Sequence, residues 1–458
     1  MAIDTEIRGY PPQSQTYLAD WWRNLRAAWH QSVLFRRVLV IVLVWMVLRL
    51  GIQGLLIAGT ILTDDLVGMD PASTLPVDMQ IYLTAAENFA ARESLYLQGS
   101  LQILETHYPY APSFALAFTP FLQLSPFAVA LVHTLLHIAA YIWLYLSWNR
   151  IFGKLGLPQA QQMLIWTLPA WLIFSTFWSD LAYLNIYLIM ALFATLLIEA
   201  VLEERLFETV LWLAVILQIK PHWAFAAAIP LLLGRYRFFI RMIGFSVVAY
   251  AGIVVATGLV GGFEYVLAQY REYVEFLARL SEDFPWRGPD APFLGYNHSI
   301  TQISVYLFGE AGFPISMIVK IALLAPLAAL GLRCLLRPIG QPGHRVPQVS
   351  LDLAFVLYMG AFIWLDMVWE LSLGIAVFTY LRATVENRRR FRWVWVLFVV
   401  YAVIDVWQAL SYIVLGDAAI VPGPYVITDP SIYLPIIMLV LLSFYGLLLV
   451  RLWRTAHA

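Results

Sequence analysis

Residues 38–62 of the chain read VLVIVLVWMVLRLGIQGLLIAGTIL, and Arg49 is the one charged residue among them. A helix rises about 1.5 Å per residue, so this run is long enough to cross the roughly 30 Å hydrocarbon core of a bilayer. The sequence therefore predicts a transmembrane helix here. Further apolar runs long enough to span follow at 126–149, 159–177, 183–200, 239–261, 313–336, 393–414 and 432–451.

The composition of the whole chain agrees with a membrane protein. Of its 458 residues, 61% are hydrophobic and 12% are charged, whereas soluble proteins carry about 25% charged residues. This excludes a soluble enzyme, a disordered scaffold and a coiled coil. The net charge of -1 provides no basic field for nucleic acid. Cys334 is the single cysteine, so internal disulfides and cysteine-based metal clusters are excluded.

Two apolar stretches are too long for one span and are interrupted by polar residues. Lys220-Pro221-His222 interrupts residues 207–234, and Asp366 and Glu370 interrupt residues 350–382. Cationic segments flank both stretches, so we expect each to cross the membrane and return as a hairpin. The prediction is an all-α integral membrane protein with about twelve transmembrane helices and both termini on one side.

The distribution of charge predicts the orientation. With the N-terminus inside, most Lys and Arg residues fall in cytoplasmic segments, as the positive-inside rule requires. We therefore expect a multi-pass protein of the plasma (inner) membrane with cytoplasmic termini. Residues 1–37 are predicted to hold a cytoplasmic interfacial helix, because Leu18, Trp21, Trp22, Leu25, Trp29 and Leu34 recur at helical spacing. Residues 38–458 form one transmembrane domain.

Two outer loops, residues 63–112 and 262–312, are rich in carboxylates and much longer than the usual helix connection of about 2–8 residues. We expect the chemistry to lie there and assign the active site to the outer face. The second loop carries an amphipathic stretch at 263–280. Asn297, His298 and Gln302 follow it and are candidates for binding sugar hydroxyls, although they also fit the start of a helix.

Asp78 is the leading candidate in the first loop. It follows Pro76 immediately before a stretch with helical periodicity, so its carboxylate also suits the N-cap position of a helix. Asp64, Asp65 and Asp70 are alternative carboxylates, and solvated turns are the simpler explanation for them.

The residues around Asp78 resemble a known family. Tyr82 follows four residues later, Leu95-Tyr96 comes next, and Tyr108-Pro109-Tyr110-Ala111-Pro112 leads into the next apolar run. This pattern is similar to glycosyltransferase family 87, the polyprenyl-phosphate-sugar-dependent transferases of the GT-C superfamily, which include mannosyltransferases of envelope glycolipids. Members often carry a Trp followed by His residues late in the chain, whereas residues 364–370 read WLDMVWE.

The resemblance implies a GT-C architecture and an activity. A sugar, expected to be mannose, would pass with inversion from a polyprenyl phosphate to a hydroxyl of a lipid-linked or glycan acceptor. The departing phosphate needs little protonation, so a single carboxylate base suffices, and we assign that role to Asp78. The sugar cleft is expected to be shaped by Tyr82, Tyr96, Tyr108 and Tyr110.

Lys220 is expected to lie sunk in the outer half of the bundle, where a charge needs an anionic partner. Two partners fit equally well: the carrier phosphate, or Asp366 or Glu370 in an internal ion pair. His222 can donate to the same phosphate or serve only in packing. Asp366 and Glu370 share a helix face, and we place both in the acceptor cleft. No metal or other cofactor is assigned.

Two alternative functions remain open at this stage. Many spans and intramembrane charges also suit a secondary transporter or lipid flippase, and the outer loops also suit an envelope glycan polymerase or ligase. The sequence has no Gly-rich phosphate loop, HExxH or GxSxG motif, which disfavours nucleotide-driven transport and proteolysis.

Overall fold

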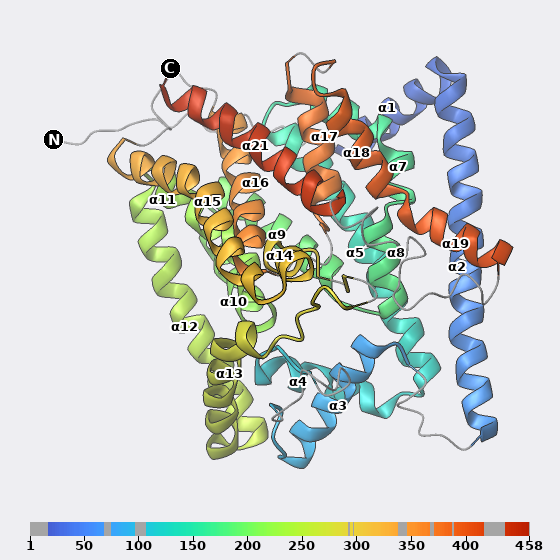
Figure 1. Ribbon diagram of the computed structural model, residues 1–458, viewed down its shortest axis with the longest axis vertical. Helices are drawn as coiled ribbons and strands as arrows, with labels where there is room; N and C mark the ends of the chain where they lie inside the picture. The colour runs from blue at the N-terminus through green and yellow to red at the C-terminus, as the bar shows by residue number, and fades with distance from the viewer. Residues whose placement is uncertain are drawn as a thin grey trace.

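The computed structural model describes residues 17–67, 75–96, 107–291, 294–295, 297–337, 346–366, 371–386, 389–415 and 436–457, and its regular structure in these ranges is helical (Figure 1). The helices are α1 (Tyr17–Gln31), α2 (Val33–Val67), α3 (Val77–Ala91), α4 (Pro112–Phe118), η4 (Thr119–Gln123), α5 (Pro126–Lys154), α6 (Pro158–Trp166), α7 (Leu168–Leu172), α8 (Ser175–Tyr183), α9 (Tyr187–Leu202), α10 (Leu206–Ile219), η5 (Pro221–Ala228), α11 (Ile229–Leu232), α12 (Tyr236–Gly261), α13 (Phe263–Asp283), α14 (Ile300–Phe308), η6 (Gly309–Ala311), α15 (Gly312–Leu336), α16 (Val346–Leu365), α17 (Gly374–Thr384), α18 (Arg392–Ala402), α19 (Ile404–Leu415) and α21 (Ile436–His457).

The structure is that of a helical membrane protein. In the described residues, six helices are long and apolar enough to cross a bilayer, and a seventh crossing results if one bent pair is counted. Helices α2 and α12 expose many large apolar side chains, among them Ile41, Leu55, Val248 and Leu259, as expected of surfaces that face lipid. By contrast, α16 lies in the core with most of its side chains buried. The expected count of twelve stays a prediction.

Several expected spans form single helices, and two do not. Helices α5, α12, α15 and α21 occupy their predicted ranges, whereas the run at 159–177 is broken into α6, α7 and α8. Pro169 lies in the first turn of α7, where a residue without an N–H cannot continue the preceding helix. The chain then bends by 118° between residues 168–183 and α9. The run at 393–414 is likewise divided, at Val403.

The predicted break at Lys220 is confirmed. Helix α10 ends at Ile219, and Lys220 follows in an extended conformation (φ -138°, ψ 89°) before η5 begins at Pro221. The residue before a proline is disfavoured in the helical region, and here it is Lys220. Helices α10 and η5 pack against one another, as expected for the two arms of a hairpin.

Helices α3 and α13, one from each of the two long loops of the sequence, lie together with α4 at one end of the molecule (Figure 1). Helix α13 contains the predicted amphipathic stretch. Gln269 Oε1 on α13 accepts a hydrogen bond from the Leu95 amide over 2.7 Å, and the Tyr265 hydroxyl donates to the Glu93 carbonyl over 2.7 Å. These bonds fix the first loop on the second.

At the opposite end from this layer lies α1, the helix predicted at the N-terminal side of the first span (Figure 1). The Trp21 indole donates to the Tyr145 hydroxyl over 3.2 Å, and Ala28 packs with Phe35 and Leu39. Leu18 and Trp22 remain exposed. The helix is therefore anchored on the bundle by one face, and its position on a membrane surface stays a prediction.

A buried ion pair joins α2 to α19. The Arg49 guanidinium donates to both carboxylate oxygens of Asp405, over 3.3 and 3.1 Å, and to Gln53 Oε1 over 3.1 Å. It also lies over the Trp178 ring, 5.4 Å from the ring centroid. The single charged residue of the first predicted span is thus paired inside the bundle.

We predict that Arg49→Met lowers the free energy of unfolding by about 3–5 kcal/mol, because it leaves the Asp405 carboxylate buried without its cation. The double variant Arg49→Met/Asp405→Leu should regain most of that loss. Unfolding of the purified protein in mixed micelles, followed by tryptophan fluorescence, measures both values. Equal losses in the single and the double variant would contradict a stabilising pair.

Candidate functional site

Asp78 lies in the first turn of α3 and does not cap it. The helix starts at Val77, Pro76 takes the N-cap position, and no side chain caps the helix. The N-cap interpretation of Asp78 is therefore wrong, because the helix begins one residue before the carboxylate. Instead, the partly buried Asp78 Oδ2 accepts a hydrogen bond from Asn185 Nδ2 over 3.1 Å.

Asn185, which the sequence analysis did not single out, organises the surroundings of Asp78. Its Oδ1 accepts from the Tyr82 hydroxyl over 3.0 Å, and its carbonyl accepts from His133 Nε2 over 3.2 Å. Its backbone N–H donates to the Asp180 carbonyl over 2.9 Å. These bonds orient the side-chain amide so that its NH₂ group faces Asp78.

The segment that carries Asn185 is held by a buried carboxylate. Asp180 is 1% exposed and accepts hydrogen bonds from the Tyr187 and Leu188 amides over 3.1 and 2.9 Å. These are the first amides of α9, which have no partner within the helix. His137 Nε2 donates to the same carboxylate over 2.9 Å. Asp180 thus caps α9 and fixes the turn that contains Asn185.

A signal for this turn exists in the sequence. Asp180 lies in the short segment 178–182 between the apolar runs 159–177 and 183–200, and Asn185 is a polar residue near the start of the second run. A polar connection between two spans is common, however, and nothing in its spacing points to α3. The contact between Asn185 and Asp78 depends on the bend between α8 and α9, which periodicity does not predict.

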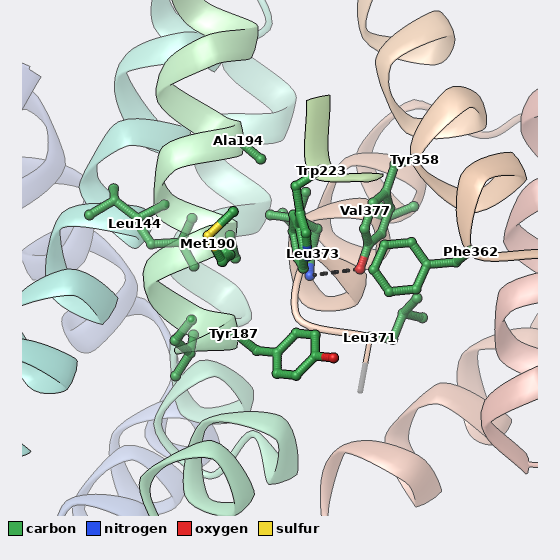
Figure 2. Close-up of a cluster of buried hydrophobic side chains, with 14 of the residues drawn as sticks. Leu144, Tyr187, Met190, Ala194, Trp223, Tyr358, Phe362, Leu371, Leu373 and Val377 are labelled. Atoms are coloured by element: carbon green, nitrogen blue, oxygen red, sulfur yellow. Dashed lines mark hydrogen bonds between the residues drawn. The ribbon is translucent and has the colours of Figure 1, made fainter. Parts of the chain in front are cut away.

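Lys220 is buried between two tyrosine rings. Its Nζ lies 4.8 Å from the centroid of Tyr110 and 4.3 Å from that of Tyr187, and it donates to the Tyr187 hydroxyl over 3.2 Å. Figure 2 shows the Tyr187 ring at the edge of a buried apolar cluster, with its hydroxyl directed away from α9. Among the described residues, no carboxylate lies within 4 Å of this ammonium group.

The predicted pairing of Lys220 with Asp366 is wrong. Asp366 pairs with Lys320, which reaches it from α15. Both lysines were placed within the bundle by the sequence, and hydropathy alone does not distinguish which one faces the end of α16. Glu370, the other predicted partner, lies outside the described residues.

Two histidines near Lys220 have a buried ring nitrogen without a hydrogen-bond partner, His222 Nε2 and His107 Nδ1. The His222 ring packs on Phe362 with centroids 5.6 Å apart. Burial, together with the charge of Lys220, lowers the pKa of His107 to about 4. His107 was not among the predicted residues.

The tyrosines predicted to shape a sugar cleft form a packed layer behind Asp78. The Tyr96 hydroxyl donates to the Tyr110 carbonyl over 2.6 Å, and the Tyr108 hydroxyl to the Ala111 carbonyl over 3.0 Å. The hydroxyls of Tyr82 and Tyr110 lie 3.2 Å apart. Since these groups bond within the protein, the tyrosines hold the site together, and their contact with sugar stays a prediction.

The candidates near the start of α14 have structural partners. Ser299 caps α14 by accepting from the Gln302 amide, and the Gln302 side chain exchanges two hydrogen bonds with the Arg287 backbone. Asn297 Nδ2 donates to the Asp366 carbonyl over 2.7 Å. Gln302 therefore stabilises the loop that contains Arg287, whereas Asn297 contacts Asp366. His298 is buried.

Other predicted carboxylates are not described. The backbone of Asp64 and Asp65 continues α2 to Val67, but their side chains, like all of Asp70, lie outside the described residues. Within the described part of the chain, no group of three or more His, Cys, Asp or Glu side chains has an arrangement that could hold a metal ion.

The environment of Asp78 adjusts its acidity. Burial raises the pKa of its carboxyl to about 7, although the Lys220 charge and the Asn185 hydrogen bond act in the opposite direction. The carboxylate of Asp180 adds to the increase. Asp78 can therefore take up and release a proton near neutral pH, which is the range that a general base needs.

Comparison with models of protein families, with curated proteins and with solved structures finds no match to this chain.

We predict that Asp78 titrates with a midpoint of about 7. Infrared difference spectra, with Asp78→Asn as the reference, should show the C=O band of the protonated carboxyl increasing as the pH falls through that value. In Lys220→Met the midpoint should move upward, because the positive charge that favours the carboxylate is lost.

The control is Glu87→Gln, which removes an exposed carboxylate of the same helix and should leave the band unchanged. A midpoint near the ordinary value for aspartate, or no shift in Lys220→Met, would contradict the described environment of Asp78.

Proposed function

We propose that this protein is a membrane glycosyltransferase that moves a sugar from a polyprenyl phosphate to an acceptor hydroxyl. The observation that carries the proposal is a partly buried carboxylate with a pKa near neutrality, Asp78, beside a buried ammonium group, Lys220, that has no carboxylate partner within 4 Å in the described residues. A base and an anion-binding cation are the two groups that this transfer requires.

Asp78 would serve as the general base. It removes the proton of the acceptor hydroxyl as the oxygen attacks the anomeric carbon, while the bond from that carbon to the phosphate oxygen breaks on the opposite face. The electron pair of that bond leaves with the polyprenyl phosphate, and the configuration inverts. One carboxylate is enough, because the phosphate departs without needing a proton.

Lys220 would hold the carrier phosphate. A buried cation is costly unless an anion accompanies it, and a phosphate oxyanion forms a strong charge-assisted hydrogen bond with an ammonium group. His222 and His107 can add donors, since each has a buried ring nitrogen without a partner. The tyrosine rings on which Lys220 lies limit its movement, so its charge stays directed at the leaving group.

The finer parts of the proposal extend the resemblance to glycosyltransferase family 87. They are a GT-C architecture with about twelve crossings, mannose as the sugar, and a site on the outer face of the plasma membrane. Support comes from α3 and α13, which follow the first span and α12 and contact one another through the rings of Phe89 and Tyr265, as expected of two long loops on the same side of the membrane.

We predict that Asp78→Asn lowers transfer by at least about a hundredfold, since general base catalysis contributes about 10²–10⁴-fold. The assay follows a labelled sugar from polyprenyl phosphate mannose into a glycolipid acceptor, using the purified full chain in lipid nanodiscs. Glu87→Gln, which removes an exposed carboxylate of the same helix, should keep full activity.

If Asp78→Asn retains transfer activity, Asp78 is not the general base. A second outcome would also contradict a transferase. If the protein moves the intact donor across a vesicle membrane without transferring its sugar, and Asp78→Asn does not change this movement, then the protein is a lipid flippase.

We predict that Lys220→Met raises the KM for the donor by about tenfold or more, because a charge-assisted bond to the phosphate is lost. The KM for the acceptor should change less than twofold, roughly within the uncertainty of such a difference measurement. Lys220→Arg keeps the charge and should retain donor binding better than Lys220→Met. An unchanged donor KM in Lys220→Met would exclude phosphate binding by this residue.

A further inference from the structure

In the described part of the chain, the pair formed by Lys320 and Asp366 has two hydrogen-bonding positions without a partner. Asp366 accepts from Lys320 through Oδ2, while its buried Oδ1 has no partner. Lys320 Nζ donates to that carboxylate and, over 3.2 Å, to the Trp364 carbonyl. An ammonium group has three N–H donors, so one remains without an acceptor in the described part of the chain.

The pair is held in a defined place. Helix α16 ends at Leu365, and Asp366 then adopts a left-handed conformation with φ 56°, a conformation that aspartate tolerates better than most residues. Asn297 Nδ2 fixes this turn by donating to the Asp366 carbonyl over 2.7 Å. Lys320 is 4% exposed and comes from the separate helix α15. The end of α16, the segment of Asn297 and α15 thus meet at Asp366.

The pair lies close to the group assigned to the donor phosphate. Phe362, whose ring packs on His222, lies in the last turn of α16, and Asp366 directly follows the end of that helix. His222 follows Lys220 by two residues. The helix that leads into Asp366 therefore also contacts a residue next to Lys220 in the chain.

The unused positions select a class of ligand. A carboxylate oxygen accepts and the adjacent ammonium group donates, so together they match neighbouring hydroxyls, each of which can donate and accept. The ion pair is neutral overall, which disfavours a phosphate or a cation as the ligand. Buried polar atoms without partners are rare in native proteins, and a bound hydroxyl would satisfy Oδ1.

We propose that Asp366 and Lys320 form a subsite for a vicinal diol of a sugar, the acceptor glycan. As the acceptor subsite it depends on the function proposed above, but sugar binding can be tested without any transfer. The probe is methyl α-D-mannopyranoside added to the full chain in lipid nanodiscs, with saturation-transfer NMR as the readout. Cyclohexanol, which lacks a vicinal diol, should not compete.

Asp366→Asn should weaken binding of this probe by about 10- to 100-fold, the effect of losing a hydrogen bond to a charged group. An amide would turn its oxygen to Lys320 and present an NH₂ group to the ligand, where an acceptor is needed. The matched control is Glu310→Gln, an exposed carboxylate in η6, which should bind the probe as the native chain does.

A second measurement uses the native chain, so it does not depend on whether the variant folds. Among the monodeoxy derivatives of the probe, removal of at least one of two neighbouring hydroxyls should weaken binding by about tenfold or more. Equal binding of all derivatives, equal binding by Asp366→Asn, or no binding of the probe would overturn the subsite. If the probe binds through Asp366 but polyprenyl phosphate mannose is not turned over, the subsite stands and the proposed transferase function fails.

Discussion

The Lys220 ammonium group is buried against the faces of two tyrosine rings, and the proposed chemistry depends on this interaction. Other buried cations in the described residues have a carboxylate: Arg49 has Asp405, and Lys320 has Asp366. Aromatic faces stabilise a cation by only about 0.5–2 kcal/mol. That is less than the desolvation of an ammonium group costs, so an additional anion at Lys220 would lower the free energy of the site.

The same cation explains why Asp78 can act as a base. Burial raises the pKa of its carboxyl, and the charge of Lys220 together with the Asn185 hydrogen bond limits the increase, so that the pKa is about 7. Asn185 reaches Asp78 because Asp180 caps α9 and fixes the preceding turn. The acidity of one side chain on α3 thus depends on a buried carboxylate at the end of α8.

The sequence predicted the helical membrane fold and several individual helices, because apolar runs of sufficient length have few other structures available to them. It also identified Lys220 as an interruption, since a proline follows it. It failed where partners come from distant segments. Asn185 belongs to no motif that would have identified it. Asp78 lies in the first turn of α3 and does not cap this helix. Asp366 pairs with Lys320 and not with Lys220. Periodicity shows which face of a helix is apolar, but not which residue of another helix meets it.

The pH dependence of transfer tests the central claim most directly. Single turnovers of polyprenyl phosphate mannose, measured in nanodiscs at saturating donor and acceptor, should slow as the pH falls below about 7, because protonated Asp78 cannot accept a proton. The acid limb should move to higher pH in Asn185→Leu, in which a hydrogen bond that lowers this pKa is lost. A rate independent of pH between about 5 and 8, or an acid limb at the same pH in both proteins, would contradict a base tuned by this site.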